Sequence, residues 1–230
     1  MAEARKRLQG AASKNVAAQL SREAGREIAC YGVRPADVHR IGLDLVRRLR
    51  SRGLPTTLAI ADPLFRSGNL EEALVGAQIV GALARLITGA DFERIAPWGG
   101  AVTSPQAADA LGANCLSPAL AAKPSLVKTM REWARSPNPS QRRAAVAAFG
   151  PLVREGRFIT DALDVAELVM EDGDEEVQRG AGAMLLEATR LQADRVVEFL
   201  EGWRERSPRL ILEIASGKLQ PAQRARALGQ

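Results

Sequence analysis

The chain has 230 residues, of which 46% are hydrophobic and 26% charged, so it is long enough to bury a sizeable globular core. Only 4% of the residues are aromatic, which favours closely packed helices over a β-sandwich, and no apolar run is long enough to span a membrane. The net charge of +5 is unevenly distributed: residues 1–52 carry +7, 53–153 carry +2, 154–201 carry −8 and 202–230 carry +4. The basic segments suggest an anionic partner.

Side chains suited to common enzyme chemistry are scarce. The one histidine, His39, and the two cysteines, Cys30 and Cys115, are too few for a structural zinc site or a disulfide scaffold. No catalytic motif surrounds His39, and no glycine-rich loop for a nucleotide occurs. We therefore expect no metal, no small-molecule cofactor and buried, unreactive thiols. Without an apolar segment typical of a secretory signal, a reduced cytoplasmic setting is the simplest expectation.

The hydrophobic periodicity predicts one helix after another and no convincing strand. A first long helix should open at Pro35 and end at Gly53, and the next should follow the N-cap Asn69 and run to Ile87. Further helices are predicted to begin, in chain order, at Ser104-Pro105, Asn138-Pro139 and Asp174. For the domain organisation we predict a flexible basic N-terminal tail over residues 1–13, a repeat domain over 14–219 and a C-terminal tail over 220–230.

The predicted helices recur with a period near 35 residues. Residues 69–81 align with 138–150 at an offset of 69, and residues 142–148 align with 178–184 at an offset of 36. Helical pairs at this spacing, with small residues in the second helix, are typical of a HEAT-like solenoid. The predicted fold class is therefore all-α, a HEAT-like helical-repeat solenoid (an α-α superhelix) that forms a single curved domain. A generic helical bundle is the alternative.

In such a solenoid the second helices of the repeats line a concave surface, where binding takes place. The equivalent position in the aligned units carries Leu74, Asp109, Arg143 and Arg179. Two arginines and one aspartate in a common groove would suit a phosphate backbone with one local acid. Ordinary helix-surface charges are the alternative interpretation. The candidate DNA-binding residues are Arg142, Arg143, Arg179, Arg47 and Arg48.

Three segments occur in the same order in a known family. They are YGVRPADV (residues 31–38), WARSPNPSQRRA (133–144) and DGDEEVQRGA (172–181). With them the chain resembles the AlkD-like DNA alkylation repair family, whose members are HEAT-like-repeat DNA glycosylases. The resemblance implies a concave basic groove that holds duplex DNA, release of alkylated purines, and a mechanism without deep base flipping.

The resemblance also implies site residues. The carboxylate that stabilises the developing cationic sugar falls on Asp109, the candidate catalytic residue. Two tryptophan rings that pack along the lesion in the family fall on Pro105 and Ala183 here. Because both rings are missing, we expect glycosylase activity on alkylated purines to be reduced or lost.

The leading hypothesis is a monomeric DNA-binding repeat protein, with duplex, alkylated or branched DNA as its partner and no membrane association. If the protein is an enzyme, it is a metal-free DNA-3-methyladenine or 7-methylguanine glycosylase, in which Trp98 on a loop could replace a missing ring. The alternative is a non-enzymatic HEAT-repeat scaffold for protein interactions, which the acidic residues 154–201 favour.

Overall fold

A computed structural model describes residues 1–229. Its secondary structure is helical throughout, and no strand occurs within those residues, as the sequence predicts. The chain divides into two compact units, an N-terminal unit of Met1–Ala122 and a C-terminal unit that begins at Lys123. None of the helices between residues 1 and 229 is both long and apolar enough to cross a membrane.

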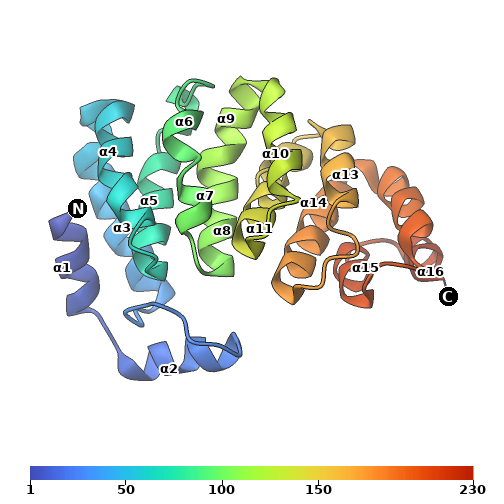
Figure 1. Ribbon diagram of the computed structural model, residues 1–230, viewed down its shortest axis with the longest axis horizontal. Helices are drawn as coiled ribbons and strands as arrows, with labels where there is room; N and C mark the ends of the chain where they lie inside the picture. Colours follow the sequence, from blue (N-terminus) through green and yellow to red (C-terminus); the bar gives the residue numbers. More distant parts are fainter. Residues whose placement is uncertain (230) are drawn as a thin grey trace. The chain divides into compact units, whose positions relative to one another are not determined.

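The N-terminal unit is a stack of helices in which α5 packs against α3, α4 and α8. Figure 1 shows α2 standing apart from this stack, at the end of a loop that returns to α3. A single π-helical turn, Gly112–Leu116, joins α8 to α9. The helices are α1 (Ala2–Gly10), α2 (Lys14–Glu23), α3 (Pro35–Leu49), α4 (Gly53–Phe65), α5 (Leu70–Gly81), α6 (Phe92–Ile95), α7 (Trp98–Ala101), α8 (Pro105–Leu111) and α9 (Ser117–Ala122).

The C-terminal unit is built around α14, which packs against α11, α12, α13, α15 and α16. α14 is long but broken, because Gln192 leaves the helical conformation with φ −135° and ψ 41°. The helices are α10 (Val127–Trp133), α11 (Pro139–Ala147), α12 (Gly150–Arg154), α13 (Ile159–Glu167), α14 (Glu175–Trp203), α15 (Arg209–Ala215) and α16 (Pro221–Leu228).

The predicted helix starts are confirmed by their caps. The Asn69 side chain accepts a hydrogen bond from the Glu72 amide, and those of Asn138 and Asp174 cap α11 and α14 in the same way. α3 ends near Gly53, as predicted, but α4 begins there at once. α5 stops at Gly81, before the predicted Ile87, because glycine is a poor helix former and a short 3₁₀ turn follows.

Small residues bring the helices close together. A side chain at Gly76 on α5 would meet the Phe65 ring on α4 at 3.2 Å, and one at Gly182 on α14 would meet the Ile214 side chain on α15 at 2.8 Å. The core is mostly aliphatic and rich in alanine, with a few buried rings such as Phe65, Trp98 and Phe149. The low aromatic content therefore reflects helix-to-helix distances too short for large side chains.

The structure differs from the prediction of two flexible tails. Residues 2–10 form α1, which buries Ala4 and Leu8 one turn apart, and residues 221–228 form α16, which buries Ala227 and Leu228. Each helix has only a few apolar residues among many charged ones, so the composition of these segments did not indicate that they pack. Ion pairs add to the apolar contacts, since Arg5 on α1 contacts the buried Glu72 carboxylate at 2.9 Å.

Candidate nucleic-acid interface

The segment that precedes α3 is held on the N-terminus of α5 by a buried carboxylate. Glu71 accepts hydrogen bonds from the backbone amides of Tyr31, Gly32 and Val33, at 2.9, 2.8 and 2.9 Å. The neighbouring Glu72 accepts one from the Tyr31 hydroxyl at 2.6 Å. Burial and this carboxylate raise the pKa of the Tyr31 hydroxyl. Charge-assisted bonds of this kind fix the loop firmly in place.

Gly32 brings α2 against that loop. Its φ of +74° is a left-handed conformation, and a Cβ there would meet the Ser13 carbonyl oxygen at 2.2 Å and the Ala17 amide nitrogen at 2.6 Å. α2 itself buries no residue completely, although Val16 and Leu20 share one face of it. The helix is therefore held by its backbone contact with the loop more than by a packed core of its own.

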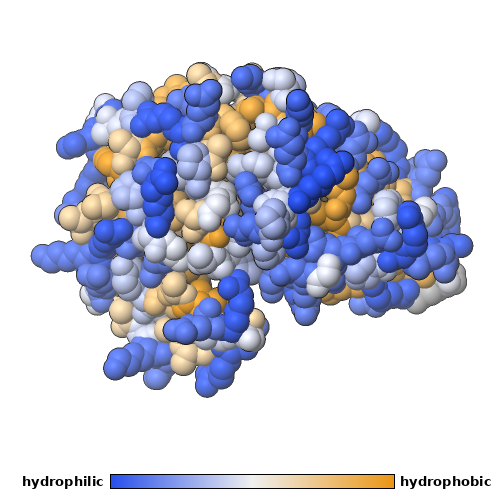
Figure 2. All heavy atoms as spheres, in the orientation of Figure 1, coloured by the Kyte–Doolittle hydropathy of each residue, from blue (hydrophilic) through white to orange (hydrophobic). Residues whose placement is uncertain are grey.

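A cavity of about 550 Å³ lies between α2, α3, α5 and α8. Exposed residues such as Pro35, His39 and Gln106 lie on its border, so it opens to solvent. In Figure 2 the lobe formed by α2 and its following loop shows apolar surface in orange framed by hydrophilic side chains in blue. The walls are aliphatic and are formed by Val16, Leu20, Val33, Val38, Leu70 and Leu74, while the polar side chains are those of His39, Glu71, Gln78, Gln106 and Asn114.

One face of α8 borders this cavity and carries the predicted catalytic residue. Gln106, Ala110 and Asn114 line the cavity at spacings of four residues, and the half-buried Asp109 lies one turn from Gln106. The Ser104 side chain caps the helix, accepting from the Ala107 amide at 3.3 Å. The π-helical turn that follows carries Asn114, and such turns are frequent at functional sites. We call Gln106, Asp109, Ala110 and Asn114 the α8 face.

Three cations belong to the elements that wall the cavity. Lys14 and Arg22 are exposed on α2, and Arg34 is exposed immediately before Pro35. None of the three is in an ion pair within residues 1–229. We call Lys14, Arg22 and Arg34 the N-terminal cations. The nearby Arg26 has a structural task instead, because it donates to the Thr103 carbonyl at 2.9 Å and ties the loop to the start of α8.

The two arginines predicted on α3 are exposed but have acidic partners. Arg47 contacts Asp44 at 3.2 Å, and its side chain is 77% exposed. Arg48 contacts Glu3 of α1 at 2.9 Å. Exposed pairs of this type are weak, so both guanidinium groups stay accessible to an anion.

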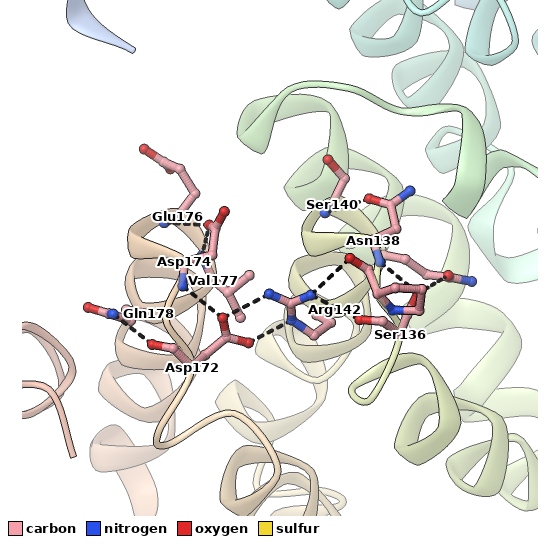
Figure 3. A network of polar contacts seen from close by, with 11 residues as sticks. Ser136, Asn138, Ser140, Arg142, Asp172, Asp174, Glu176, Val177 and Gln178 are labelled. Carbon is pink, nitrogen blue, oxygen red and sulfur yellow. Dashed lines mark hydrogen bonds and ion pairs between the residues drawn. The ribbon is translucent and has the colours of Figure 1, made fainter. Parts of the chain in front are cut away.

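Arg142 on α11 is the centre of a polar network in the C-terminal unit (Figure 3). Its guanidinium group contacts both carboxylate oxygens of Asp172 at 2.6 and 2.8 Å and donates to the Ser136 carbonyl at 2.9 Å. The side chains of Arg142 and Asp172 are only 17% and 7% exposed. The hydrogen bonds to Asp172 and the charge of this carboxylate raise the pKa of Arg142. The arrangement locks α11 to the loop that precedes α14.

Arg143 and Arg179 differ in their accessibility. Arg143 is buried and donates to both the backbone and the carboxylate of Glu176, the latter at 2.9 Å. Arg179 is half-exposed and pairs with Glu175 one turn earlier on α14. The C-terminal unit thus contains Arg142, Arg143 and Arg179, whereas Asp109, Arg47 and Arg48 belong to the N-terminal unit.

The suggestion that Trp98 replaces a missing lesion-packing ring is wrong. Trp98 is 0% exposed, stacks on Phe65 with ring centroids 4.4 Å apart, and donates its indole N–H to Asp62 at 2.9 Å. Trp133 is also buried, as expected for a ring that packs between helices. Trp203 stacks beneath the Arg206 guanidinium group at 4.2 Å. The three tryptophans therefore leave the α8 face without an indole ring.

The thiols differ slightly from the prediction. Cys115 is buried, which raises its pKa strongly, as expected for a core thiol. Cys30 is only half-buried, and burial together with the nearby Glu71 carboxylate raises its pKa. Both thiols are thus protonated and weakly nucleophilic at neutral pH.

Sequence reasoning missed the cavity. Gln78, Gln106 and Asn114 belong to no motif, and the helices that carry them are separated in the sequence. One signal was present: Gln106 and Asn114 lie eight residues apart, so in a continuous helix their side chains point in a similar direction and mark a polar face, close to Asp109.

Comparisons with known proteins agree on one family. The model of a family described as DNA alkylation repair enzyme matches residues 4–219. No curated protein sequence matches the chain. A solved structure described as a predicted DNA alkylation repair enzyme from Enterococcus faecalis is 12% identical, with a TM-score of 0.73, and the match covers 91% of this chain and 97% of that chain. This likeness confirms the predicted all-α, HEAT-like fold.

Proposed function

The chain belongs to the DNA alkylation repair enzyme family, and from this premise we propose that it binds duplex DNA, including alkylated or branched DNA. The observation that carries the proposal is the combination of an accessible α8 face, with Asp109 on it, and three exposed cations of the same unit, Lys14, Arg22 and Arg34, that are in no ion pair among residues 1–229. Lys and Arg side chains that are free of internal partners are those most available to phosphates.

The five arginines predicted from the sequence take different roles in this proposal. Arg47, Arg48 and Arg179 have exposed guanidinium groups in weak pairs, and we propose them as additional phosphate contacts. Arg142 and Arg143 are largely buried in bonds to the start of α14, so we assign them a structural role.

For chemistry on a lesion we propose Asp109 as the carboxylate that stabilises positive charge on the sugar. Such a group acts by being held near the place where charge develops. We propose that this activity is weak, because the described residues place no indole ring on the α8 face. Two missing cation–π contacts of about 1–2 kcal/mol each correspond to a loss of roughly tenfold to a thousandfold in rate. We further propose that the protein is a monomer and that it acts in the cytoplasm. Light scattering on the purified chain tests the monomeric state.

DNA binding is tested by fluorescence anisotropy with a labelled duplex over a range of salt concentrations. We expect measurable binding at ~50 mM salt and a steep fall in affinity as salt rises, since bound phosphates release counterions. Absence of binding to linear, methylated and branched duplexes at that salt concentration would refute the proposal.

The role of Asp109 is tested by counting bases released from methylated DNA. Asp109→Asn should reduce any release, while Glu93→Gln, which removes one negative charge from exposed α6 of the same unit, should leave it unchanged. Equal release by the wild type and Asp109→Asn would exclude Asp109 as the active carboxylate.

The alternative function, a protein-interaction scaffold, depended on the acidic residues 154–201. Many of those carboxylates are already paired within the C-terminal unit: Asp164 with Arg131, Asp172 with Arg142, Glu176 with Arg143, Glu187 with Arg154 and Glu201 with Arg226. The charge that favoured a basic protein partner is thus largely balanced inside the molecule. We therefore favour DNA as the partner.

A further inference from the structure

We propose that Gln106 is a specificity-determining residue: it contacts the minor-groove edge of the base whose sugar Asp109 faces, and it favours purines alkylated at N7 over purines alkylated at N3. This inference rests on the proposed function and adds the class of lesion that is recognised. The base stays stacked in the duplex, in agreement with a mechanism without deep base flipping. Three features support it: the exposed amide of Gln106, the anchored turn that carries it, and its spacing from Asp109.

Gln106 is the exposed side chain of α8. Four of the seven residues of this helix are buried and two are half-buried, which leaves Gln106 as the exposed one. Pro105, on which one lesion-packing ring of the family falls, is among the buried residues. The side chain that the first turn of α8 offers to a ligand is therefore an amide and not a ring.

The Gln106 amide has no hydrogen-bond partner among residues 1–229. The other two amides that border the cavity are engaged. The Gln78 amide nitrogen lies 3.2 Å from both the ring Nδ1 and the carbonyl oxygen of His39, and Asn114 donates to the Ala110 carbonyl at 3.0 Å. Because an amide has a donor and an acceptor, Gln106 offers both to the edge of a base.

The backbone that carries Gln106 is anchored at the start of the helix. The Thr103 hydroxyl donates to the Gly68 carbonyl at 2.9 Å, the Thr103 carbonyl accepts from Arg26 at 2.9 Å, and the Ser104 side chain caps α8. These bonds fix the first turn of α8, so only the side-chain torsions of Gln106 have to be ordered when a ligand binds. A contact made from such a turn loses little free energy to ordering.

The spacing of Gln106 and Asp109 directs the amide to the minor groove. The two residues are three positions apart on one helix, which places their Cβ atoms about 5–6 Å from each other. In a stacked duplex the C1′ and O4′ atoms of the sugar line the minor groove, so a carboxylate reaches the charge on an unflipped sugar from that groove. A side chain one turn earlier on the same helix then meets the minor-groove edge of the attached base, where every purine presents N3.

Alkylation at N7 and at N3 leaves different groups at that edge. A purine alkylated at N7 carries the added group in the major groove and keeps the N3 lone pair, to which the Gln106 amide N–H donates. A purine alkylated at N3 has lost this lone pair and places an alkyl group against the amide instead. Because one hydrogen bond is present in the first case and absent in the second, Gln106 should favour the N7 lesion by about threefold to tenfold.

The test measures affinity for duplexes that differ at one central purine. One duplex carries 7-methylguanine on a 2′-fluorinated sugar, which resists loss of the base, and the other carries 3-methyl-3-deazaadenine, a stable analogue of 3-methyladenine. Both are titrated by fluorescence anisotropy at ~50 mM salt, together with an unmodified duplex. The positive charge of 7-methylguanine also attracts Asp109, so the informative quantity is the change in the ratio of the two affinities in a variant.

Gln106→Met tests the amide itself. It keeps the length of the side chain and removes both hydrogen-bonding groups, and thermal melts establish that it folds as the wild type does. Gln19→Met is the matched control, because it removes an exposed amide of the same unit that already bonds to Glu23 of its own helix at 2.8 Å. Asp109→Asn in the same titrations measures the part of the ratio that is due to charge.

The proposal predicts that Gln106→Met lowers the preference for 7-methylguanine by about threefold to tenfold. Affinity for the 3-methyl-3-deazaadenine duplex should be unchanged or higher, and Gln19→Met should keep the wild-type ratio. A ratio that Gln106→Met leaves unchanged, or that Gln19→Met lowers equally, would overturn the proposal while the proposed DNA binding stands. If the wild type binds none of the three duplexes, the proposed function fails and this inference fails with it.

Discussion

Both units of the molecule contain ion pairs between distant helices, but they differ in the cations that are left without an acidic partner near the candidate site. In the C-terminal unit, arginines pair with carboxylates about one repeat further along the chain: Arg131 with Asp164, Arg142 with Asp172 and Arg154 with Glu187, at separations of 33, 30 and 33 residues. The N-terminal unit has similar pairs, such as Arg7 with Asp44 and Arg48 with Glu3, but Lys14, Arg22 and Arg34 are in no ion pair among residues 1–229. The three C-terminal arginines therefore hold neighbouring repeats together, whereas Lys14, Arg22 and Arg34 of the N-terminal unit are available to an anion.

This difference affects how the net charge of a sequence segment should be interpreted. Residues 1–52 carry +7 and residues 154–201 carry −8, which looks like a basic and an acidic surface. The acidic segment instead supplies the partners for arginines in neighbouring repeats, as the Arg142–Asp172 pair shows. A net charge becomes an argument about partners only after internal ion pairs have been subtracted.

The largest expected effect concerns Arg142. Arg142→Met should lower the free energy of unfolding by about 3 kcal/mol, because it leaves the buried Asp172 carboxylate without its partner. Urea denaturation followed by circular dichroism measures this loss. A change below about 0.5 kcal/mol, the size expected of an exposed pair, would show that the buried network does not hold α11 to α14.

The second prediction concerns the N-terminal cations. The triple variant Lys14→Gln, Arg22→Gln, Arg34→Gln should lower duplex affinity on the order of a hundredfold and reduce the salt slope by about 3, since each lost phosphate contact removes about one unit. Its stability should stay near that of the wild type because the three side chains have no internal ion pairs among the described residues.

Anisotropy titrations across salt concentrations test this prediction. The matched control neutralises three exposed cations of the C-terminal unit that are in no ion pair among residues 1–229, Lys128, Lys218 and Arg224. If both triple variants lose the same affinity, binding follows net charge alone and the contrast between the units fails.

A third prediction concerns the pH dependence of a pair in the N-terminal unit. Burial opposes ionisation of Asp62, but hydrogen bonds from Trp98 and Arg66 prevail and lower its pKa. The stability that it contributes is therefore present above the ordinary carboxyl pKa of about 4 and is lost as pH falls through the lowered value. Unfolding curves from pH 7 to pH 3 should show the wild type approaching Asp62→Asn in acid. A constant difference between the two would contradict this account.

The smallest expected effect is at Arg179. Arg179→Met should change stability by no more than about 0.5 kcal/mol, because its partner Glu175 is exposed and one turn away. Urea denaturation of Arg179→Met and Arg142→Met under the same conditions compares the free energy that an exposed and a buried ion pair contribute within one unit. A loss as large as that of Arg142→Met would remove the distinction.

The sequence predicted the local features of the fold because these depend on neighbouring residues. Asn69, Asn138 and Asp174 are recognisable as caps since each side chain bonds to an amide two or three residues later. The repeat period was also visible, since it reflects one helical pair after another. The division into two units was not predicted, and neither was the packing of α1, whose burial depends on two apolar side chains, Ala4 and Leu8.

The candidate site was less predictable because it joins distant segments. Asp109 was identified through its position in the family pattern, and the structure places it on an accessible face. That Arg142 would face Asp172 depends on how two repeats stack, which no local pattern contains. The cavity combines side chains of four separate helices, so only the assembled unit reveals it.

The central claim is that DNA lies against the N-terminal unit at α2, the following loop and the α8 face. Hydrogen–deuterium exchange of the full chain, with and without a duplex, tests it most directly. α2 buries no side chain completely, so its amides should exchange readily in the free protein and slow markedly with DNA, together with residues 31–39 and the start of α8. Protection confined to α11 and α14, with α2 unchanged, would contradict the account.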